Sequence, residues 1–575
     1  MTSPKTRNLS IIAWCTIALI ALAYTYVYYH RTLNGPFRFN DDVAQHYLWL
    51  FGEYYDADWQ DGFYARASAA LQPWGYYLLL KFCGWFIDPL TISRYGVFAL
   101  ALGTVGYATA LFRRFVPVAL AVGAGLVVFH YSLLITTGFL ARGFMIPLLL
   151  AFGYYLVLGE RPWQLGGTLV VSALFYPPAL VINLTILGLF SLAELLFSHC
   201  GCLRWWARSQ VRRKVPPEKR TKLPLRSWGI YAGSAVLSLL LIWLHSRGVK
   251  ASPELGDFLP RETLLNAPEF SAQGRVAVTN VMNTDLGFFI RYFTDRYLPS
   301  DFAPHFGRIV LFLALAAGLF HWRQLGRLTG WAAALAATTL LLFLFAQAVF
   351  PLLFLPDRFI VYPWLLLTGV VLFLVTAGIY RLYPRPWLST LLVVLLLSYA
   401  HYNRDPQGFG FVGLDDADKY EFYDAIRALP PEANIVAPPE VASWFPAMAQ
   451  RMPFLSTETA HALYFSRYHD YVMPRFADYA EAISTRGDDL EPVRDFMDKW
   501  ELDYLLIDVE KLRRRQHDLW APHKAVFEAS KDQLGPGELF TLEKIPEDVG
   551  VWIRKRHRIL SRNDLNLTLK QTISE

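Results

Sequence analysis

Apolar and polar residues follow one another in long blocks over the first 400 positions, and the apolar blocks have lengths suited to a membrane. A helix needs about 20 mostly apolar residues to cross roughly 30 Å of hydrocarbon. A further run, 73–87 (PWGYYLLLKFCGWFI), is shorter, aromatic and interrupted by Lys81, and predicts a helix at the membrane interface. The eleven predicted spans are 9–29, 92–112, 115–133, 143–159, 163–182, 183–200, 228–246, 307–322, 329–350, 359–380 and 387–401.

The distribution of basic residues supports this arrangement. Loops rich in Lys and Arg remain on the cytoplasmic side of a membrane. Arg113, Arg114 and the loop 200–227, which has nine basic residues against the single acid Glu218, all fall on one side if 73–87 does not cross. The sequence therefore predicts a polytopic α-helical membrane protein with about eleven transmembrane helices. The outside loops would be 30–91 and 247–306.

Residues 402–575 are more polar and predict a small α/β domain outside the membrane, following a membrane module at 1–401. Helical spacing occurs in DDADKYEFYDAIRAL and DDLEPVRDFMDKWEL, while ANIVAPP and DYLLIDV have strand patterns. AVFEAS and GELFTLEKI are expected to add edge strands. The basic segment 551–575 is expected to touch lipid headgroups or to fray.

Composition excludes several classes of function. Charged residues make up 18% of the 575 positions, below the quarter or so of a soluble protein, and the net charge of +6 is spread over loops, so no nucleic-acid partner is predicted. The four cysteines lie in or beside apolar runs and form neither a disulfide framework nor a zinc pattern. Because nucleotide-binding and H-E-x-x-H motifs are also absent from the sequence, we predict no cofactor and no metal.

An acidic and aromatic segment, FRFNDDVAQHYLWLFGEYYDADW (37–59), follows the first span almost directly. One interpretation of Asp41 and Asp42 is a helix cap, because acids there complement the helix dipole. The other is a sugar site: on a continuous helix Asp42, His46, Trp49 and Glu53 would form one polar and aromatic stripe beside the membrane. Rings stack on the apolar face of a sugar while carboxylates accept its hydroxyls.

Three basic residues lie where the positive-inside rule does not place them. Arg142 and Arg358 occupy short outside loops, and Lys81 lies on the predicted interfacial helix. Each side chain can simply extend to water from the end of a span. Alternatively they bind a phosphate leaving group, because guanidinium groups match phosphate oxygens.

The layout resembles the GT-C superfamily of polytopic glycosyltransferases, which includes the protein O-mannosyltransferases and the bacterial lipid A aminoarabinose transferases. NDDVAQHY, QPWGYYLLLKFCGWF and the following span RYGVFALALGTVGYATALFRRF resemble the acidic pair, interfacial helix and second span of those families. The resemblance implies that Asp41 corresponds to the catalytic carboxylate and that Asp42 supports it. Oligosaccharyltransferases add acidic metal ligands in a second outside loop. The matching loop here, ITTGFLARG, has no acid, which favours a metal-independent mechanism with Arg142 in that role.

The predicted function is an inverting glycosyltransferase that moves a sugar from a polyprenyl-phosphate-linked donor to an acceptor hydroxyl on the outer face of a bacterial inner (plasma) membrane. The acceptor is a glycan, a lipid or a protein, membrane lipid surrounds the spans, and Asp41 acts as general base. Two alternatives stay open. One is a transporter or flippase of lipid-linked sugars, and the other is an envelope polysaccharide polymerase or ligase.

Overall fold

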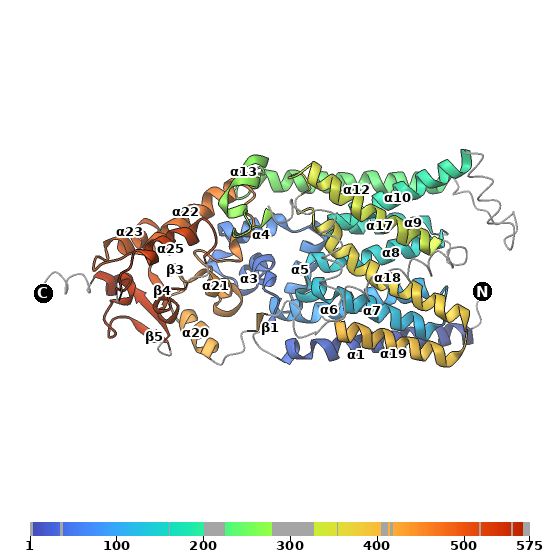
Figure 1. Ribbon diagram of the computed structural model, residues 1–575, viewed down its shortest axis with the longest axis horizontal. Coiled ribbons are helices and arrows are strands. Elements are labelled where there is room, and N and C mark those ends of the chain that lie inside the picture. The colour runs from blue at the N-terminus through green and yellow to red at the C-terminus, as the bar shows by residue number, and fades with distance from the viewer. Residues whose placement is uncertain are drawn as a thin grey trace.

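A computed structural model describes residues 4–34, 38–159, 161–199, 225–278, 327–353, 355–403, 412–413, 418–516, 519–536, 538–553 and 556–566. The predicted span 307–322, nearly all of the basic loop 200–227 and the second half of the outside loop 247–306 lie outside these ranges. The described chain is elongated, with long helices at one end and a mixed sheet at the other (Figure 1).

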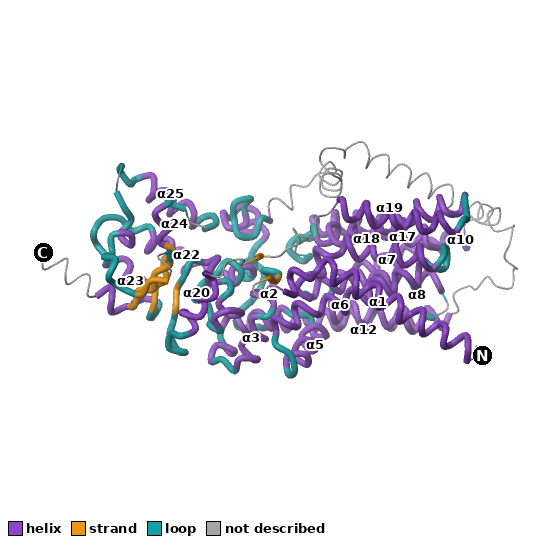
Figure 2. Tube along the Cα trace, turned by 90° about the horizontal axis from the view of Figure 1, so that it is seen from below, coloured by secondary structure: helices purple, strands orange, loops and turns teal. Residues whose placement is uncertain are grey.

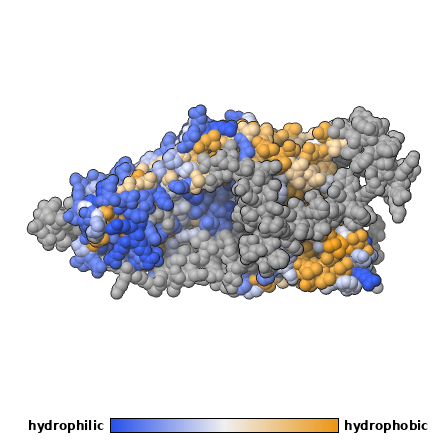
Figure 3. All heavy atoms as spheres, viewed as in Figure 1, coloured by the Kyte–Doolittle hydropathy of each residue, from blue (hydrophilic) through white to orange (hydrophobic). Residues whose placement is uncertain are grey.

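The helical end consists of long helices that run side by side along the longest axis (Figures 1 and 2). On the face shown in Figure 3, the described residues of this end are mainly hydrophobic, whereas those of the opposite end are mainly hydrophilic. The long helices are α1 (Pro4–Asn34), α6 (Pro89–Phe112), α7 (Val118–Thr136), α8 (Met145–Leu158), α9 (Pro162–Phe175), α10 (Pro177–His199), α12 (Leu225–Ala251), α17 (Arg327–Ala348), α18 (Arg358–Leu382) and α19 (Pro386–Asn403).

Six helical segments among the described residues are long and apolar enough to cross a membrane: Ile11–His30, Pro89–Phe112, Ala141–Leu158, Ser227–Ala251, Leu328–Ala348 and Arg358–Leu382. Three shorter apolar helices, Val118–Leu133, Pro177–Ala193 and Pro386–His401, lie at other predicted spans. These positions agree with the predicted polytopic helical architecture, and the total of eleven spans stays a prediction.

One predicted boundary is wrong. The spans were expected to divide between residues 182 and 183, but the helix breaks at Tyr176, which has extended backbone angles (φ −154°, ψ 91°). Pro177 and Pro178 follow, and a proline disfavours helical angles in the residue before it. The break leaves α9 with 14 residues. That length reaches only about 21 Å, less than the thickness of the hydrocarbon layer.

The segment predicted as the first outside loop consists of short elements: β1 (Arg38–Phe39), α2 (Asp42–His46), α3 (Leu48–Tyr55), η1 (Asp58–Asp61), α4 (Phe63–Leu71) and α5 (Trp74–Gly84). Helix α5 has 11 residues. At about 16 Å it is too short to cross, as expected of the run 73–87. Tyr76 and Leu80 are fully buried on one face, whereas Leu78, Phe82 and Trp85 are more than half exposed on the other. This amphipathic pattern fits the predicted interfacial position, which stays a prediction.

Further short elements connect the long helices. The connection between α7 and α8 forms two 3-10 turns, η2 (Thr137–Phe139) and η3 (Ala141–Phe144). The chain after α12 forms α13 (Arg261–Asn266) and η5 (Pro268–Phe270). Beyond α19, β2 (Val412–Gly413) returns to pair antiparallel with β1.

Residues 418–566 surround a four-stranded mixed sheet with strand order β3-β4-β6-β5. Strands β3 and β4 are parallel, and the other two pairs are antiparallel. The elements are α20 (Asp418–Arg427), β3 (Ile435–Val436), α21 (Pro439–Ala442), η7 (Phe445–Ala449), η8 (Thr459–His461), α22 (Ser466–Ile483), α23 (Glu491–Lys499), β4 (Tyr504–Asp508), α24 (Val509–Arg513), α25 (His523–Asp532), η9 (Thr541–Glu543), β5 (Val551–Ile553) and β6 (His557–Ser561).

Two predicted edge strands in this region are wrong, and the start of the basic segment does not fray. AVFEAS lies in helix α25, where His523 and Phe527 bury one face at a spacing of four residues. GELFTLEKI contains the turn η9, because the Glu543 side chain accepts a hydrogen bond from the Phe540 backbone N–H (2.9 Å). The start of the basic segment 551–575 supplies strands β5 and β6, where the buried Arg558 donates to the carbonyls of Val549 (2.7 Å) and Ile545 (2.9 Å). Residues 567–575 lie outside the described ranges, and lipid contact by this segment stays a prediction.

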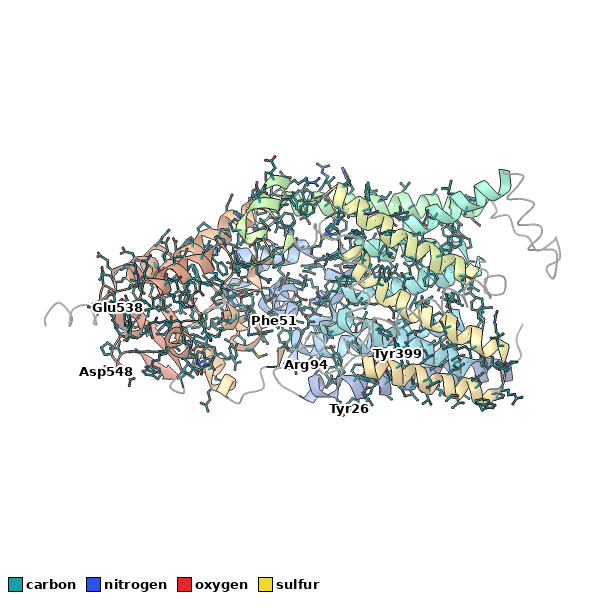
Figure 4. All side chains as sticks on the ribbon, viewed as in Figure 1. Tyr26, Phe51, Arg94, Tyr399, Glu538 and Asp548 are labelled. Carbon is teal, nitrogen blue, oxygen red and sulfur yellow. The ribbon has the colours of Figure 1, made fainter. Side chains whose placement is uncertain are left out.

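The first outside loop and the C-terminal region share one hydrophobic core. Trp49, Phe51 and Tyr76 of the loop belong to the same buried cluster as Phe445 and Leu506 of the C-terminal region. Phe51 lies near the middle of the molecule, between the helical end and the sheet (Figure 4). The loop that carries the acidic pair is therefore covered by apolar side chains from both ends of the sequence.

Candidate functional site

The acidic pair begins helix α2. Asp41 is the N-cap, and its side chain accepts a hydrogen bond from the Asp42 backbone N–H (3.0 Å). Asn40 accepts from the same N–H (3.0 Å) and donates to the Thr137 hydroxyl (2.7 Å). The helix-cap interpretation is thus confirmed for Asp41. The bond to Thr137 in addition ties the acidic segment to the connection between α7 and α8.

Asp42 forms an ion pair with Arg142. One Asp42 oxygen, Oδ2, contacts Nη2 of Arg142, which lies on turn η3. The two side chains are 26% and 23% exposed. A pair that is three quarters removed from water is screened less than a surface pair. Arg142, predicted from its place against the positive-inside trend, therefore faces the predicted acidic pair.

The two carboxyl groups have opposite pKa shifts. Burial, and then the neighbouring charge of Asp42, raises the pKa of Asp41. Burial also acts to raise the pKa of Asp42, but Arg142 and His46 outweigh it, so that pKa is lowered. Asp42 is consequently a fixed anion, whereas Asp41 is a stronger base than an ordinary aspartate. Pairs of acids whose environments separate their pKa values in this way suit different chemical roles.

A second arginine lies close by at the start of α18. Arg358 interacts electrostatically with Asp42 and His46. Tyr176, at the break between α9 and α10, has Arg358 and Arg142 among its electrostatic neighbours. These side chains come from four separate elements and converge on the acidic pair.

Three buried polar atoms in this cluster have no hydrogen-bond partner among the described residues. They are Nε of Arg142, the hydroxyl of Tyr176 and Oδ1 of Asp357. Buried donors and acceptors without partners are uncommon in folded proteins, and at a functional site they are often completed by a ligand. The Arg142 and Tyr176 atoms are both able to donate, so oxygen atoms of a ligand are their natural partners.

Three site residues lacked any signal in the sequence. Glu458 and His461 come from the C-terminal region, and Arg275 comes from the loop after α12. Arg275 donates from Nε to the Thr457 carbonyl (2.7 Å), and its Nη2 lies 3.5 Å from Oε1 of Glu458. Their burial depends on contacts between distant segments, so no local pattern could have revealed them.

Glu458 and His461 face the acidic pair from the C-terminal side. Burial raises the pKa of Glu458 to about 7, although Arg275 acts in the opposite direction. The His46 and His461 rings lie 6.2 Å apart. Burial lowers the pKa of His46 to about 4 and holds the pKa of His461 well below its usual value. Both imidazoles are therefore neutral at pH 7.

The predicted stripe on one helix is wrong beyond His46. Tyr47 has non-helical angles (φ −101°, ψ 3°) and separates α2 from α3, so Trp49 and Glu53 do not continue the face of Asp42. Trp49 instead stacks on Tyr77 with ring centroids 4.4 Å apart. Glu53 accepts a hydrogen bond from Lys81 (3.0 Å).

The structure thus brings together Asp41, Asp42, His46, Arg142 and Arg358 of the predicted set. Trp49, Glu53 and Lys81 make their contacts elsewhere: no interaction of Lys81 in the described chain reaches the acidic pair. Within the described ranges, no group of three or more His, Cys, Asp or Glu side chains is arranged to hold a metal ion.

No family model and no curated protein matches this chain. Similar solved structures include two of the Archaeoglobus fulgidus oligosaccharyltransferase. One, tethered with an acceptor peptide containing the NVT sequon via a disulfide bond, is 13% identical, with a TM-score of 0.46 and coverage of 90% of this chain and 72% of that chain. The other, a complex with Zn and sulfate, is 13% identical, with a TM-score of 0.44 and coverage of 86% and 68%. At 13% identity, these structures do not assign a role to any side chain of this protein.

Proposed function

We propose that this protein is an inverting membrane glycosyltransferase that uses a polyprenyl-phosphate-linked sugar donor on the outer face of a bacterial inner membrane. The observation that carries the proposal is the pair of unpartnered buried donors, Arg142 Nε and the Tyr176 hydroxyl, beside the acidic pair. A phosphate group would supply acceptor oxygens for both donors. Asp41, the member of the acidic pair that has the raised pKa, interacts with Arg142 and would supply the base.

In the proposed reaction Asp41 accepts the proton of an acceptor hydroxyl as general base. The oxygen attacks the anomeric carbon, and the bond from that carbon to the phosphate oxygen breaks with inversion. Polyprenyl phosphate leaves with the bonding electron pair. A base works best when its pKa lies close to the working pH, so the raised pKa of Asp41 favours this role over Asp42.

Arg142 and Arg358 are proposed to stabilise the negative charge that develops on the leaving phosphate. Preorganised donors in a site that excludes water are effective because they need no reorganisation during the reaction. Asp42 keeps Arg142 in place through their ion pair. Lys81 has no part in the proposed phosphate site, because it forms an ion pair with Glu53.

The place of the cluster suits a lipid-linked donor. Arg142 and Arg358 lie at the ends of two apolar helices, where a phosphate at the membrane surface would be while its lipid chain remains among the helices. The acceptor would approach from the hydrophilic end of the molecule (Figure 3).

The test compares cells lacking this protein with cells that express wild type, Asp41→Asn or the control Asp58→Asn at matched levels. Asp58 is an exposed acid in the same outside loop, so its substitution changes the charge of the loop without altering the cluster. Envelope glycans are profiled by mass spectrometry. Wild type and Asp58→Asn are expected to restore a missing sugar, and Asp41→Asn is not. Full restoration by Asp41→Asn would reduce Asp41 to a helix cap and would favour a transporter of lipid-linked sugars.

A further inference from the structure

The turn that presents Arg142 to Asp42 has an uncommon backbone. Gly138 and Phe139 are consecutive residues with positive φ angles of 76° and 51°. Glycine adopts such angles freely, but a phenylalanine does so only when surrounding contacts hold it there. The feature lies three residues before Arg142, so whatever fixes Phe139 also fixes the start of the turn η3.

Two tyrosine hydroxyls contact this residue. Tyr47 donates to the Phe139 carbonyl at 3.3 Å and Tyr76 donates to the same oxygen at 3.0 Å. Both tyrosines are fully buried. A carbonyl oxygen has two lone pairs, so the two hydroxyls use its whole acceptor capacity.

The ring of Phe139 is fixed as well. It packs so closely over Gly96 of α6 that an added Cβ there would lie 2.1 Å from the ring. Gly138 is equally enclosed, because an added Cβ would lie 2.9 Å from Val43 and 3.0 Å from Asn40. The turn is therefore held on one side by α6 and on the other by the segment of the acidic pair.

The two hydroxyls come from elements with different roles. Tyr47 follows directly on α2, the helix of the acidic pair, and Tyr76 lies on the buried face of the amphipathic helix α5. The Phe139 carbonyl therefore connects the loop that carries Arg142 to α2 and to α5. We infer that Tyr47 and Tyr76 are positioning residues that hold the Phe139 turn and thereby set Arg142 against Asp42.

The effect of this positioning on catalysis rests on the proposed function, but the positioning itself does not. The variants are Tyr47→Phe, Tyr76→Phe and the double variant, each of which removes only a hydroxyl. Tyr64→Phe is the matched control, because Tyr64 is also buried and donates to a backbone carbonyl, that of Phe454 (3.2 Å), outside this turn.

The first measurement is hydrogen–deuterium exchange of peptides covering 137–146 in lipid nanodiscs. The Gly143 amide, which donates to the Leu140 carbonyl (2.8 Å), lies in this segment. We expect exchange to be about tenfold faster in the double variant and unchanged in Tyr64→Phe, because local opening becomes easier only where the hydroxyls acted. Each single variant retains one hydroxyl, so an intermediate increase is expected there.

The second measurement is the pH dependence of sugar transfer. The Arg142 charge acts to lower the pKa of the proposed base Asp41. A loosened Arg142 does so less, and the acid limb of the profile is therefore expected to move to higher pH in the double variant. We also expect kcat to fall about tenfold with KM little changed, the pattern of an interaction that is made in the transition state. A merely structural role would lower the amount of folded protein and leave both the pH profile and the kcat of the folded enzyme unchanged.

The outcomes separate the two hypotheses. Faster exchange in the double variant together with no sugar transfer by wild type supports the positioning role and refutes the proposed function. Unchanged exchange at 137–146 in the double variant, or an equal increase in Tyr64→Phe, overturns the positioning role whatever the transfer activity.

Discussion

The ion pair between Asp42 and Arg142 can be tested through its contribution to stability. Asp42→Asn removes the charge with little change of volume and leaves Arg142 without its anion. Removing one partner of a fully buried pair costs about 3–5 kcal/mol, whereas exposed pairs contribute about 0–1 kcal/mol. With 26% and 23% of the two side chains exposed, this pair lies between these cases. We expect a coupling free energy of about 2 kcal/mol, or a factor of roughly 30 in the unfolding equilibrium.

The assay is a double-mutant cycle of Asp42→Asn, Arg142→Gln and the double variant. The free energy of unfolding is measured by titrating a denaturing detergent into mixed micelles at pH 7. Each single variant should be less stable than wild type, and the double variant should lose less than the sum of the two. A coupling below about 0.5 kcal/mol would refute the reasoning, because the pair would then behave as an exposed, screened contact.

The same cycle has a definite pH dependence. Because the pKa of Asp42 is lower in the folded protein than in the unfolded chain, its stabilisation is complete above the unfolded value of about 3.9. It is lost as the pH falls below that value and through the folded pKa. The coupling should therefore be the same at pH 7 and pH 5 and should decline only below about pH 4. A decline that begins near pH 6 would mean that another group carries the interaction.

Three further predictions follow from individual contacts. Gly138→Ala should lower the unfolding free energy by about 1–2 kcal/mol, because the residue has φ +76° and no space for a Cβ. The control Gly106→Ala should not lower it, because no atom lies within 4 Å of a Cβ added there. A detergent titration measures both variants. Glu458→Gln should raise the unfolding temperature relative to wild type at pH 8 but not at pH 5. The pKa of Glu458 is about 7 in the folded protein and lower in the unfolded chain, so wild type loses stability as the pH rises from about 4.5 to 7. An equal difference in unfolding temperature at both pH values would contradict this. Lys81→Gln should change sugar transfer less than twofold, because the lysine and its partner Glu53 form an exposed ion pair, with 37% and 34% of their side chains in solvent. A loss of transfer as large as that of Arg142→Gln would return Lys81 to the phosphate site.

The sequence was informative where the physical signal is local. Among the described residues, hydropathy located most of the apolar helices within a few residues, because an apolar helix is a continuous run of one residue type. The break at Tyr176 was missed even though Pro177 and Pro178 indicated it, since a hydropathy window averages over the residues that end a helix. AVFEAS was assigned to a strand for a similar reason: a short apolar run fits both periods.

Some features of the candidate site could be predicted from the sequence, and others depend on the tertiary fold. Arg142 and Arg358 could be singled out because an arginine in a predicted outside loop violates a topological trend that is visible in the sequence. That Arg142 contacts Asp42 could not be predicted, because 100 positions separate them and only the tertiary fold joins them. The error over Trp49 and Glu53 came from assuming a continuous helix through Tyr47, where neither proline nor glycine marks the break.

Glu458 shows what a sequence leaves out in principle. Its pKa of about 7 results mainly from burial. Leu455 and Ala460 beside it belong to the same buried cluster as Leu48 and Tyr64 of the distant segment that follows α1. The same packing brings His461 within 6.2 Å of His46 and helps to remove water from the acidic pair. Without that cover Asp41 would be solvated and its pKa would return toward that of an ordinary aspartate, which is a weaker base at neutral pH. In the proposed reaction the C-terminal region, whose Glu458 and His461 interact electrostatically with the acidic pair, is therefore part of what makes Asp41 an effective base.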